Sequence, residues 1–82
     1  MITAVIEHDE VNDFLKIRGL AERYKKAKTY LLDGHMSAVN FKKRMPLSRD
    51  VWSLRVTKKY RAFCYLKGTT LVVSEINDHQ EN

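Results

Sequence analysis

Two arginines and a histidine in the second half of the chain have the side chains that phosphodiester cleavage requires. Arg55 and Arg61 flank a predicted turn, and His79 follows the last apolar segment. Histidine can act as general acid or base near neutral pH, because its unperturbed pKa is about 6.5. The planar arginine side chain stabilises the charge that spreads over a phosphoryl group. An RNA substrate supplies its own nucleophile, the 2′-hydroxyl, so these three residues are candidate catalytic residues.

Basic residues are concentrated around these candidates. The 82-residue chain has a formal net charge of +5, and residues 42–61 contain eight Lys and Arg side chains against the single acid Asp50. Aromatic residues are interspersed among them, which favours a nucleic-acid surface over an ordinary solvated basic face. A second basic stretch lies at residues 20–28. The candidate RNA- or ribosome-binding residues are Lys42, Lys43, Arg44, Arg49, Lys58, Lys59, Lys25 and Lys26.

Several other classes of chemistry lack their residues in this sequence. Cys64 is the single cysteine and no pair of histidines has ligand spacing, so neither an intrachain disulfide nor a metal site is predicted. No glycine-rich phosphate loop or nucleophile triad is present, and no cofactor is predicted. Apolar stretches are far shorter than the roughly 20 residues of a membrane span. We therefore expect a cytoplasmic protein with no membrane partner.

The chain is predicted to fold as one domain over residues 1–82. Residues 2–6 are typical of a strand, and two helical stretches follow, the second with an apolar stripe from Leu20 to Leu31. After Asp50 the alternation of apolar and polar residues predicts three antiparallel strands. The predicted fold class is α+β: a small antiparallel sheet, made of the N-terminal strand and a C-terminal three-stranded meander, packed on two N-terminal helices. A further strand within residues 39–45 is an alternative.

The turns of the meander decide which residues face the helices. Two-residue turns at Lys58-Lys59 and Lys67-Gly68 put Phe63 opposite both Leu54 and Val72. This register leaves Arg55 and His79 on the open face, the face that the helices do not cover, and puts Arg61 at the end of the core face. A bulge or a longer turn would move Arg61 to the open face. The predicted core face comprises Trp52, Leu54, Val56, Phe63, Tyr65, Val72 and Ile76.

Four short motifs, which together span roughly residues 45–80, resemble those of a known family. They are Met45-Pro46-Leu47, Val51-Trp52-Ser53-Leu54-Arg55-Val56, Tyr60-Arg61-Ala62-Phe63-Cys64-Tyr65, and Leu71-Val72-Val73 leading to Asp78-His79. In this order they are similar to the "PL … WSRRI … HRLVY … LLI … H" pattern of the RelE/ParE toxin superfamily. The resemblance is closest to the YoeB and Txe branch.

The resemblance implies a RelE-like (microbial RNase-like) sheet and the toxin of a type II toxin–antitoxin system. Such a toxin is a metal-independent, ribosome-dependent endoribonuclease, an mRNA interferase, which cleaves mRNA in the ribosomal A site and leaves a 2′,3′-cyclic phosphate. Its partners are the ribosome, mRNA and a cognate antitoxin protein. In this reading Arg61 stabilises the transition state, His79 is the general acid and Arg55 is an auxiliary phosphate contact.

Met45 stands where that branch has the glutamate that acts as general base. We therefore hypothesise that Lys42, Lys43 or Arg44 takes its place. Three other readings stay open at this point. The protein could be a ParE-like non-enzymatic inhibitor of DNA gyrase, a catalytically inactive relative with a RelE fold, or a generic basic RNA-binding module.

Overall fold

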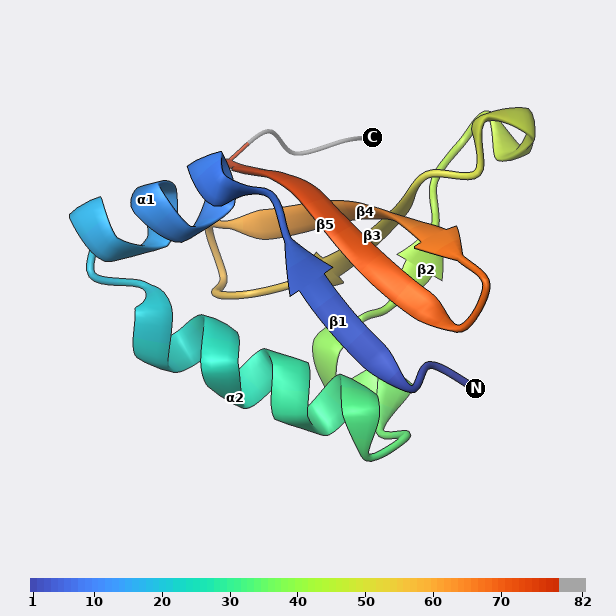
Figure 1. The fold of residues 1–82 in the computed structure, drawn as a ribbon, viewed down its shortest axis with the longest axis horizontal. Coiled ribbons are helices and arrows are strands. Elements are labelled where there is room, and N and C mark those ends of the chain that lie inside the picture. Colours follow the sequence, from blue (N-terminus) through green and yellow to red (C-terminus); the bar gives the residue numbers. More distant parts are fainter. Residues whose placement is uncertain (79–82) are drawn as a thin grey trace.

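The computed structural model describes residues 1–78. They form two α-helices, two short 3₁₀ helices and a five-stranded mixed sheet with strand order β1-β5-β4-β3-β2 (Figure 1). The predicted α+β class, with the N-terminal strand and the C-terminal meander packed on two helices, is confirmed. The elements are β1 (Ala4–Glu7), α1 (Asp9–Ile17), α2 (Ala21–Leu32), η1 (Met36–Val39), β2 (Lys42–Lys43), η2 (Leu47–Arg49), β3 (Trp52–Arg55), β4 (Arg61–Lys67) and β5 (Thr70–Asn77).

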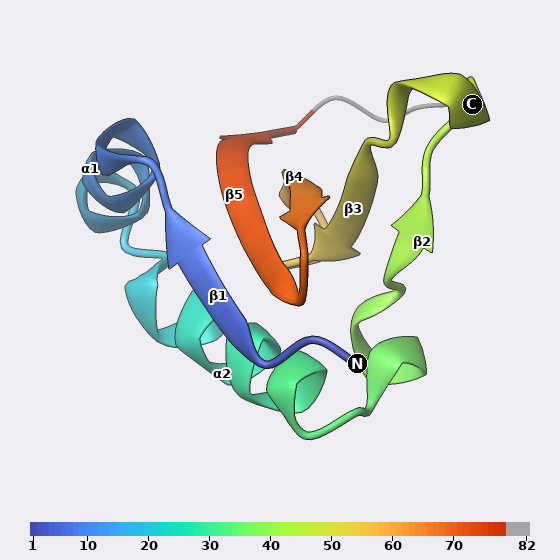
Figure 2. The ribbon, with the colours of Figure 1, turned by 45° about the vertical axis from the view of Figure 1, so that its right-hand side comes forward.

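Both α-helices lie on the same side of the sheet (Figures 1 and 2). Helix α1 begins with Asp9 and Glu10, whose negative charges favour its N-terminal turn. Gly19 lies between α1 and α2 and adopts a φ of +67°, a backbone conformation that favours glycine. Helix α2 buries a stripe of Tyr24, Ala27 and Leu31, as its sequence spacing predicts. Neither described α-helix has the length and apolar character needed to cross a membrane.

Strand β1 pairs with β5 in parallel, from Ala4 opposite Thr70 to Glu7 opposite Val73. The prediction of a wholly antiparallel sheet was therefore wrong, because the sheet is mixed. Two helices follow β1, so no tight turn forces it to run antiparallel to its neighbour. The sequence pattern identified the strand but contained no signal for its direction.

Strand β4 presents the opposite face from the one predicted, because its pairing with β3 differs by one residue from the predicted register. The β4–β5 turn keeps two residues and is displaced by one, which does not by itself change the face. At the β4–β5 turn Lys67 pairs with Thr70, and at the β3–β4 turn Arg55 pairs with Arg61. The small residues Ala62 and Cys64 are therefore the ones that face the helices, with 0% and 1% of their surface exposed.

The prediction that Phe63, Tyr65 and Val72 belong to the core face was consequently wrong. Leu54 lies opposite Ala62 and not opposite Phe63, and Val72 lies opposite Tyr65 and not opposite Phe63.

A β-bulge in β5 keeps apolar residues in the core on both sides of it. Between the pairs Cys64–Val73 and Phe63–Glu75, Ser74 is the extra residue of β5. Its hydroxyl donates a hydrogen bond of 3.2 Å to the carbonyl oxygen of Phe63. Leu71, Val73 and Ile76 are therefore all buried, although strict alternation would send one of the last two to the open face.

One polar cluster ties the helices to the sheet. The Tyr24 hydroxyl donates a hydrogen bond of 2.7 Å to Glu7 Oε2, and Lys28 Nζ lies 2.9 Å from the same oxygen. Burial, reinforced by the bond to Glu7, raises the pKa of Tyr24 well above its ordinary value. The cluster is therefore a neutral phenol and an ion pair that position α2 against β1.

Candidate functional site

Arg55, Arg61 and Asn77 lie side by side on the open face. Arg61 is paired with Arg55 of β3 on one side and with Asn77 of β5 on the other. Paired residues of neighbouring strands point to the same face of the sheet. Arg61 therefore lies on the open face, contrary to the register predicted from two-residue turns and as expected for longer turns. The two candidate catalytic arginines are brought together across adjacent strands.

This pair of arginines is electrostatically unfavourable on its own. Like charges directly opposite each other on neighbouring strands destabilise a sheet. Neither arginine forms an ion pair with an acid among residues 1–78, where the ion pairs are Lys28–Glu7 and Lys43–Asp50. An anion that bridges the two guanidinium groups would relieve the repulsion, so the pair has the charge of a phosphate-binding site.

Two buried polar atoms of the open face have no hydrogen-bond partner within the described part of the chain. They are Nη1 of the half-buried Arg61 and Oγ of Ser53, whose exposed fraction is 0%. Ser53 lies diagonally from Arg61, because it is two residues before Arg55 on β3. A buried polar group without a partner costs about 1–3 kcal/mol. Both atoms can donate a hydrogen bond, but each is enclosed by the fold, so an oxygen of a ligand would reach them only after neighbouring side chains move.

Aromatic side chains surround the arginine pair. Phe63 lies opposite Ser53, and the Arg44 guanidinium carbon is 5.9 Å from the centroid of the Phe63 ring. Tyr65 is 40% exposed and meets His8 edge-to-face, with ring centroids 6.4 Å apart. Aromatic rings beside arginines are suited to stacking with the bases of single-stranded nucleic acid. The flip of β4 is therefore what places these rings beside the cations.

Acidic residues are few on this part of the open face. Glu75 lies opposite Phe63 and accepts a hydrogen bond of 2.9 Å from Asn77 Nδ2. That bond directs one carboxylate oxygen along β5, and Glu75 forms no ion pair in the described residues. The balance of charge around Arg55 and Arg61 remains positive.

The predicted RNA-binding residues divide between this site and other parts of the surface. Lys42 lies opposite Ser53 on the open face. Arg44 continues that edge, since its N–H donates a hydrogen bond of 2.7 Å to the carbonyl oxygen of Val51. Lys43 is held in an ion pair with Asp50, with 2.8 Å between Nζ and Oδ1.

The other predicted residues lie farther away. Arg49 is in the exposed helix η2, whereas Lys58 and Lys59 are in the β3–β4 turn. Lys25 and Lys26 belong to α2 on the helix-covered side. Lys26 and Arg55 line one hollow at the end of β3, whereas Lys25 does not line it. His79 lies outside the described residues. The described part of the chain holds no cluster of three or more His, Cys, Asp or Glu side chains suited to a metal ion.

Sequence reasoning missed Ser53 and Phe63 as parts of the site. The signal for Ser53 was present, because Ser53 and Arg55 are two residues apart on the same strand and therefore lie on the same face. The signal for Phe63 was hidden by the turn lengths, since a one-residue difference changes the face on which it lies. The chain matches no protein-family model, and no curated protein matches it in sequence. A functional assignment must therefore be built on the residues of this site.

Proposed function

We propose that this protein is the toxin of a type II toxin–antitoxin system and acts as a ribosome-dependent endoribonuclease on mRNA. The observation that carries the proposal is the pair Arg55–Arg61 on the open face, with Arg61 Nη1 buried and unpartnered within residues 1–78. The resemblance of the motifs around both arginines to RelE/ParE toxins supplies the reaction class. That the chain belongs to the RelE/ParE superfamily is itself part of the proposal.

In the proposed reaction the 2′-hydroxyl of the RNA attacks the adjacent phosphorus. The bond from phosphorus to the 5′-oxygen of the next nucleotide breaks, which leaves a 2′,3′-cyclic phosphate and a free 5′-hydroxyl. Arg61 and Arg55 stabilise the negative charge that gathers on the phosphoryl oxygens in the transition state. His79 donates a proton to the leaving 5′-oxygen. No metal is needed in this scheme, because the charge is neutralised by guanidinium groups.

Lys42 is the best candidate for the group that receives the proton of the 2′-hydroxyl, a role in which it must react as the neutral amine. Of the three basic residues considered for this role, Lys43 is engaged with Asp50, and Arg44 has a guanidinium that proteins do not deprotonate. Lys42 lies on the open face opposite Ser53 and forms no ion pair in the described part of the chain. Lys42→Ala is therefore expected to slow cleavage more than Lys43→Ala.

The proposed partners follow from the charge of the chain. Ribosome and mRNA would be bound through phosphates, so their affinity should fall steeply as salt rises. A cognate antitoxin would need an acidic segment that covers the arginine pair.

The test is translation in a cell-free bacterial system, with mRNA ends mapped by primer extension. The wild type should produce discrete cuts in translated mRNA, and the cuts should be lost with His79→Ala and retained with Lys16→Gln at an exposed position of α1. Intact mRNA and undiminished translation would reject the enzymatic proposal. DNA supercoiling by gyrase would then be assayed, because inhibition there would point to the ParE-like alternative.

A further inference from the structure

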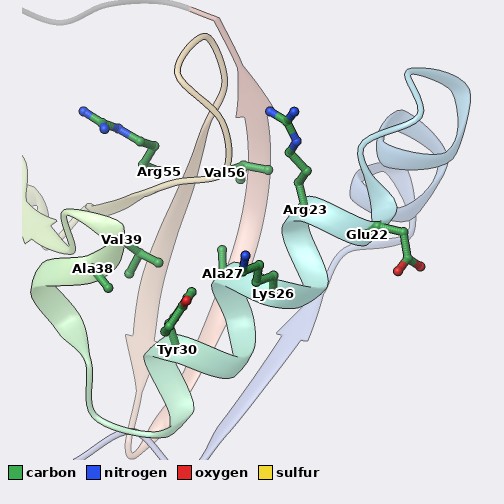
Figure 3. A pocket seen from close by; sticks show the side chains of 9 residues that line it. All are labelled: Glu22, Arg23, Lys26, Ala27, Tyr30, Ala38, Val39, Arg55 and Val56. Atoms are coloured by element: carbon green, nitrogen blue, oxygen red, sulfur yellow. The ribbon is translucent and has the colours of Figure 1, made fainter.

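A concave surface lies on the helix-covered side of the sheet, between α2, η1 and the end of β3 (Figure 3). This hollow has a volume of about 490 Å³, within the range of small-molecule sites. Ala27, Val39 and Val56 are buried residues that give it an apolar lining, and Tyr30 of α2 adds an aromatic ring that is 38% exposed. The hollow therefore offers a flat apolar group a place to bind.

The rim of the hollow is positively charged. Arg23 and Lys26 extend from α2, and Arg55 stands at the opposite side beside Val56 (Figure 3). None of the three forms an ion pair among residues 1–78. Glu22 is the acid nearby, and Figure 3 shows its carboxylate pointing away from the other side chains of the hollow. Arg23 and Lys26 are thus available to an anion on the α2 side, while the Arg55 guanidinium on the opposite side points away from them (Figure 3).

We infer that this hollow binds a nucleotide. Its phosphate would lie against Arg23 and Lys26 of α2, and its base would stack on Tyr30 above the apolar lining. Cationic side chains recognise phosphate, and stacking on an aromatic ring accepts any base. An acidic peptide would also be attracted by the rim, but it would leave the aromatic and apolar part of the hollow unused. The assignment goes beyond the proposed nuclease activity and does not depend on it.

The nucleotide has two conceivable sources. It is either a free mononucleotide or one unit of an RNA strand. The position of Arg55 does not distinguish between the two sources. Arg55 lines the hollow and also pairs with Arg61 on the open face. An RNA strand that crosses the sheet at Arg55 would reach both sites.

The experiment is a titration of the full-length ¹⁵N-labelled protein, followed by the amide signals of Tyr30, Ala38 and Val56. The probes are AMP, ribose 5-phosphate, and a single-stranded dodecamer of 2′-O-methyl RNA, which lacks the nucleophile for cleavage. AMP or the dodecamer should shift these signals, and ribose 5-phosphate should bind about tenfold more weakly than AMP because it has no base to stack. Shifts with AMP identify a free nucleotide, and shifts with the dodecamer alone identify an RNA subsite.

Three variants locate the binding. Lys26→Gln should weaken binding about tenfold through loss of a charged phosphate contact, and Tyr30→Ala should weaken it about as much through loss of stacking. Lys16→Gln removes the same charge from an exposed position of α1, which does not line the hollow, and should leave the affinity unchanged. The inference is overturned if neither AMP nor the dodecamer shifts these amides, if Lys16→Gln weakens binding as much as Lys26→Gln, or if ribose 5-phosphate binds as tightly as AMP. Since no step of this titration requires cleavage, it can succeed or fail independently of the nuclease assay.

Discussion

The two faces of strand β4 differ in how well they satisfy the requirements of a stable sheet. The helix-covered face places Ala62 and Cys64 in close packing with Leu54, Leu71 and Val73, all of them at most 1% exposed. The open face places Arg61 opposite Arg55 and leaves a buried guanidinium nitrogen and a buried hydroxyl without partners in the described residues. The first arrangement stabilises the fold, whereas the second opposes it. A costly arrangement that persists beside a well-packed core is most simply explained by a ligand, because a phosphate would supply the missing partners.

Arg61→Met separates the two faces most sharply. It removes the charge and the donors but keeps an unbranched chain of similar length. Cleavage of translated mRNA should fall about 100- to 1,000-fold, the usual effect of removing one preorganised donor to developing negative charge. The free energy of unfolding should stay the same or rise, because a like-charge pair and an unpartnered donor disappear.

The matched control for this change is Lys67→Met on the same strand, which removes the same charge from a fully solvated position. It should leave the cleavage rate within about twofold of wild type. A parallel loss of activity and stability in Arg61→Met, measured by primer extension and by urea unfolding, would mean that Arg61 has a structural role.

Leu71→Ala probes the helix-covered face. Leu71 is fully buried in β5, so its truncation should lower the free energy of unfolding by about 2–5 kcal/mol. The measurement is urea unfolding monitored by the fluorescence of Trp52. Residual folded protein should cleave at the wild-type rate, because the substitution leaves the open face intact. A selective loss of activity at full stability would contradict the division between the faces.

Cys64 allows the same face to be tested by pH. Burial raises the pKa of its thiol from 9.0 to about 12. Between these two pH values the folded protein keeps the thiol proton, whereas the unfolded chain has lost it. The contribution of Cys64 to stability is therefore complete below pH 9 and is lost as the pH rises from 9 towards 12. Between pH 9 and pH 10 the free energy of unfolding of wild type should fall by about 1 kcal/mol more than that of Cys64→Ala. Equal pH dependence of the two proteins would show that the thiol is not protected by the helices.

Ser53→Ala should give the smallest effects. It should raise the free energy of unfolding and lower the rate of cleavage. Removal of a buried hydroxyl without a partner should raise the free energy of unfolding by about 1 kcal/mol. If Ser53 Oγ binds a phosphate oxygen, the same change should slow cleavage about tenfold, because one hydrogen bond to a charged group is lost. Lower stability in the variant would indicate that the hydroxyl is satisfied within the fold, for example by an internal water.

The sequence was sufficient to predict both α-helices and the strands β1, β3, β4 and β5, but not the short elements between residues 36 and 49 or the way in which β1 and β4 are placed. The stripe of Tyr24, Ala27 and Leu31 identified α2, and the alternation from Trp52 to Arg55 identified β3, because helix and strand periodicities are local properties. The face of β4 and the direction of β1 depend on turn lengths and on a crossover, which residue types only weakly specify. Arg55 and Arg61 were recognised as candidates from their chemistry, yet their pairing required the register of the sheet.

The central claim is that Arg61, which opposes Arg55 and has an unpartnered nitrogen within residues 1–78, binds phosphate on the open face. The most direct measurement is the free energy of unfolding as a function of inorganic phosphate, at constant ionic strength, for wild type, Arg61→Met and Lys67→Met. Phosphate should stabilise wild type and Lys67→Met to the same extent, since a ligand that binds only the folded state stabilises it. It should stabilise Arg61→Met markedly less. Equal stabilisation of all three proteins would contradict the claim.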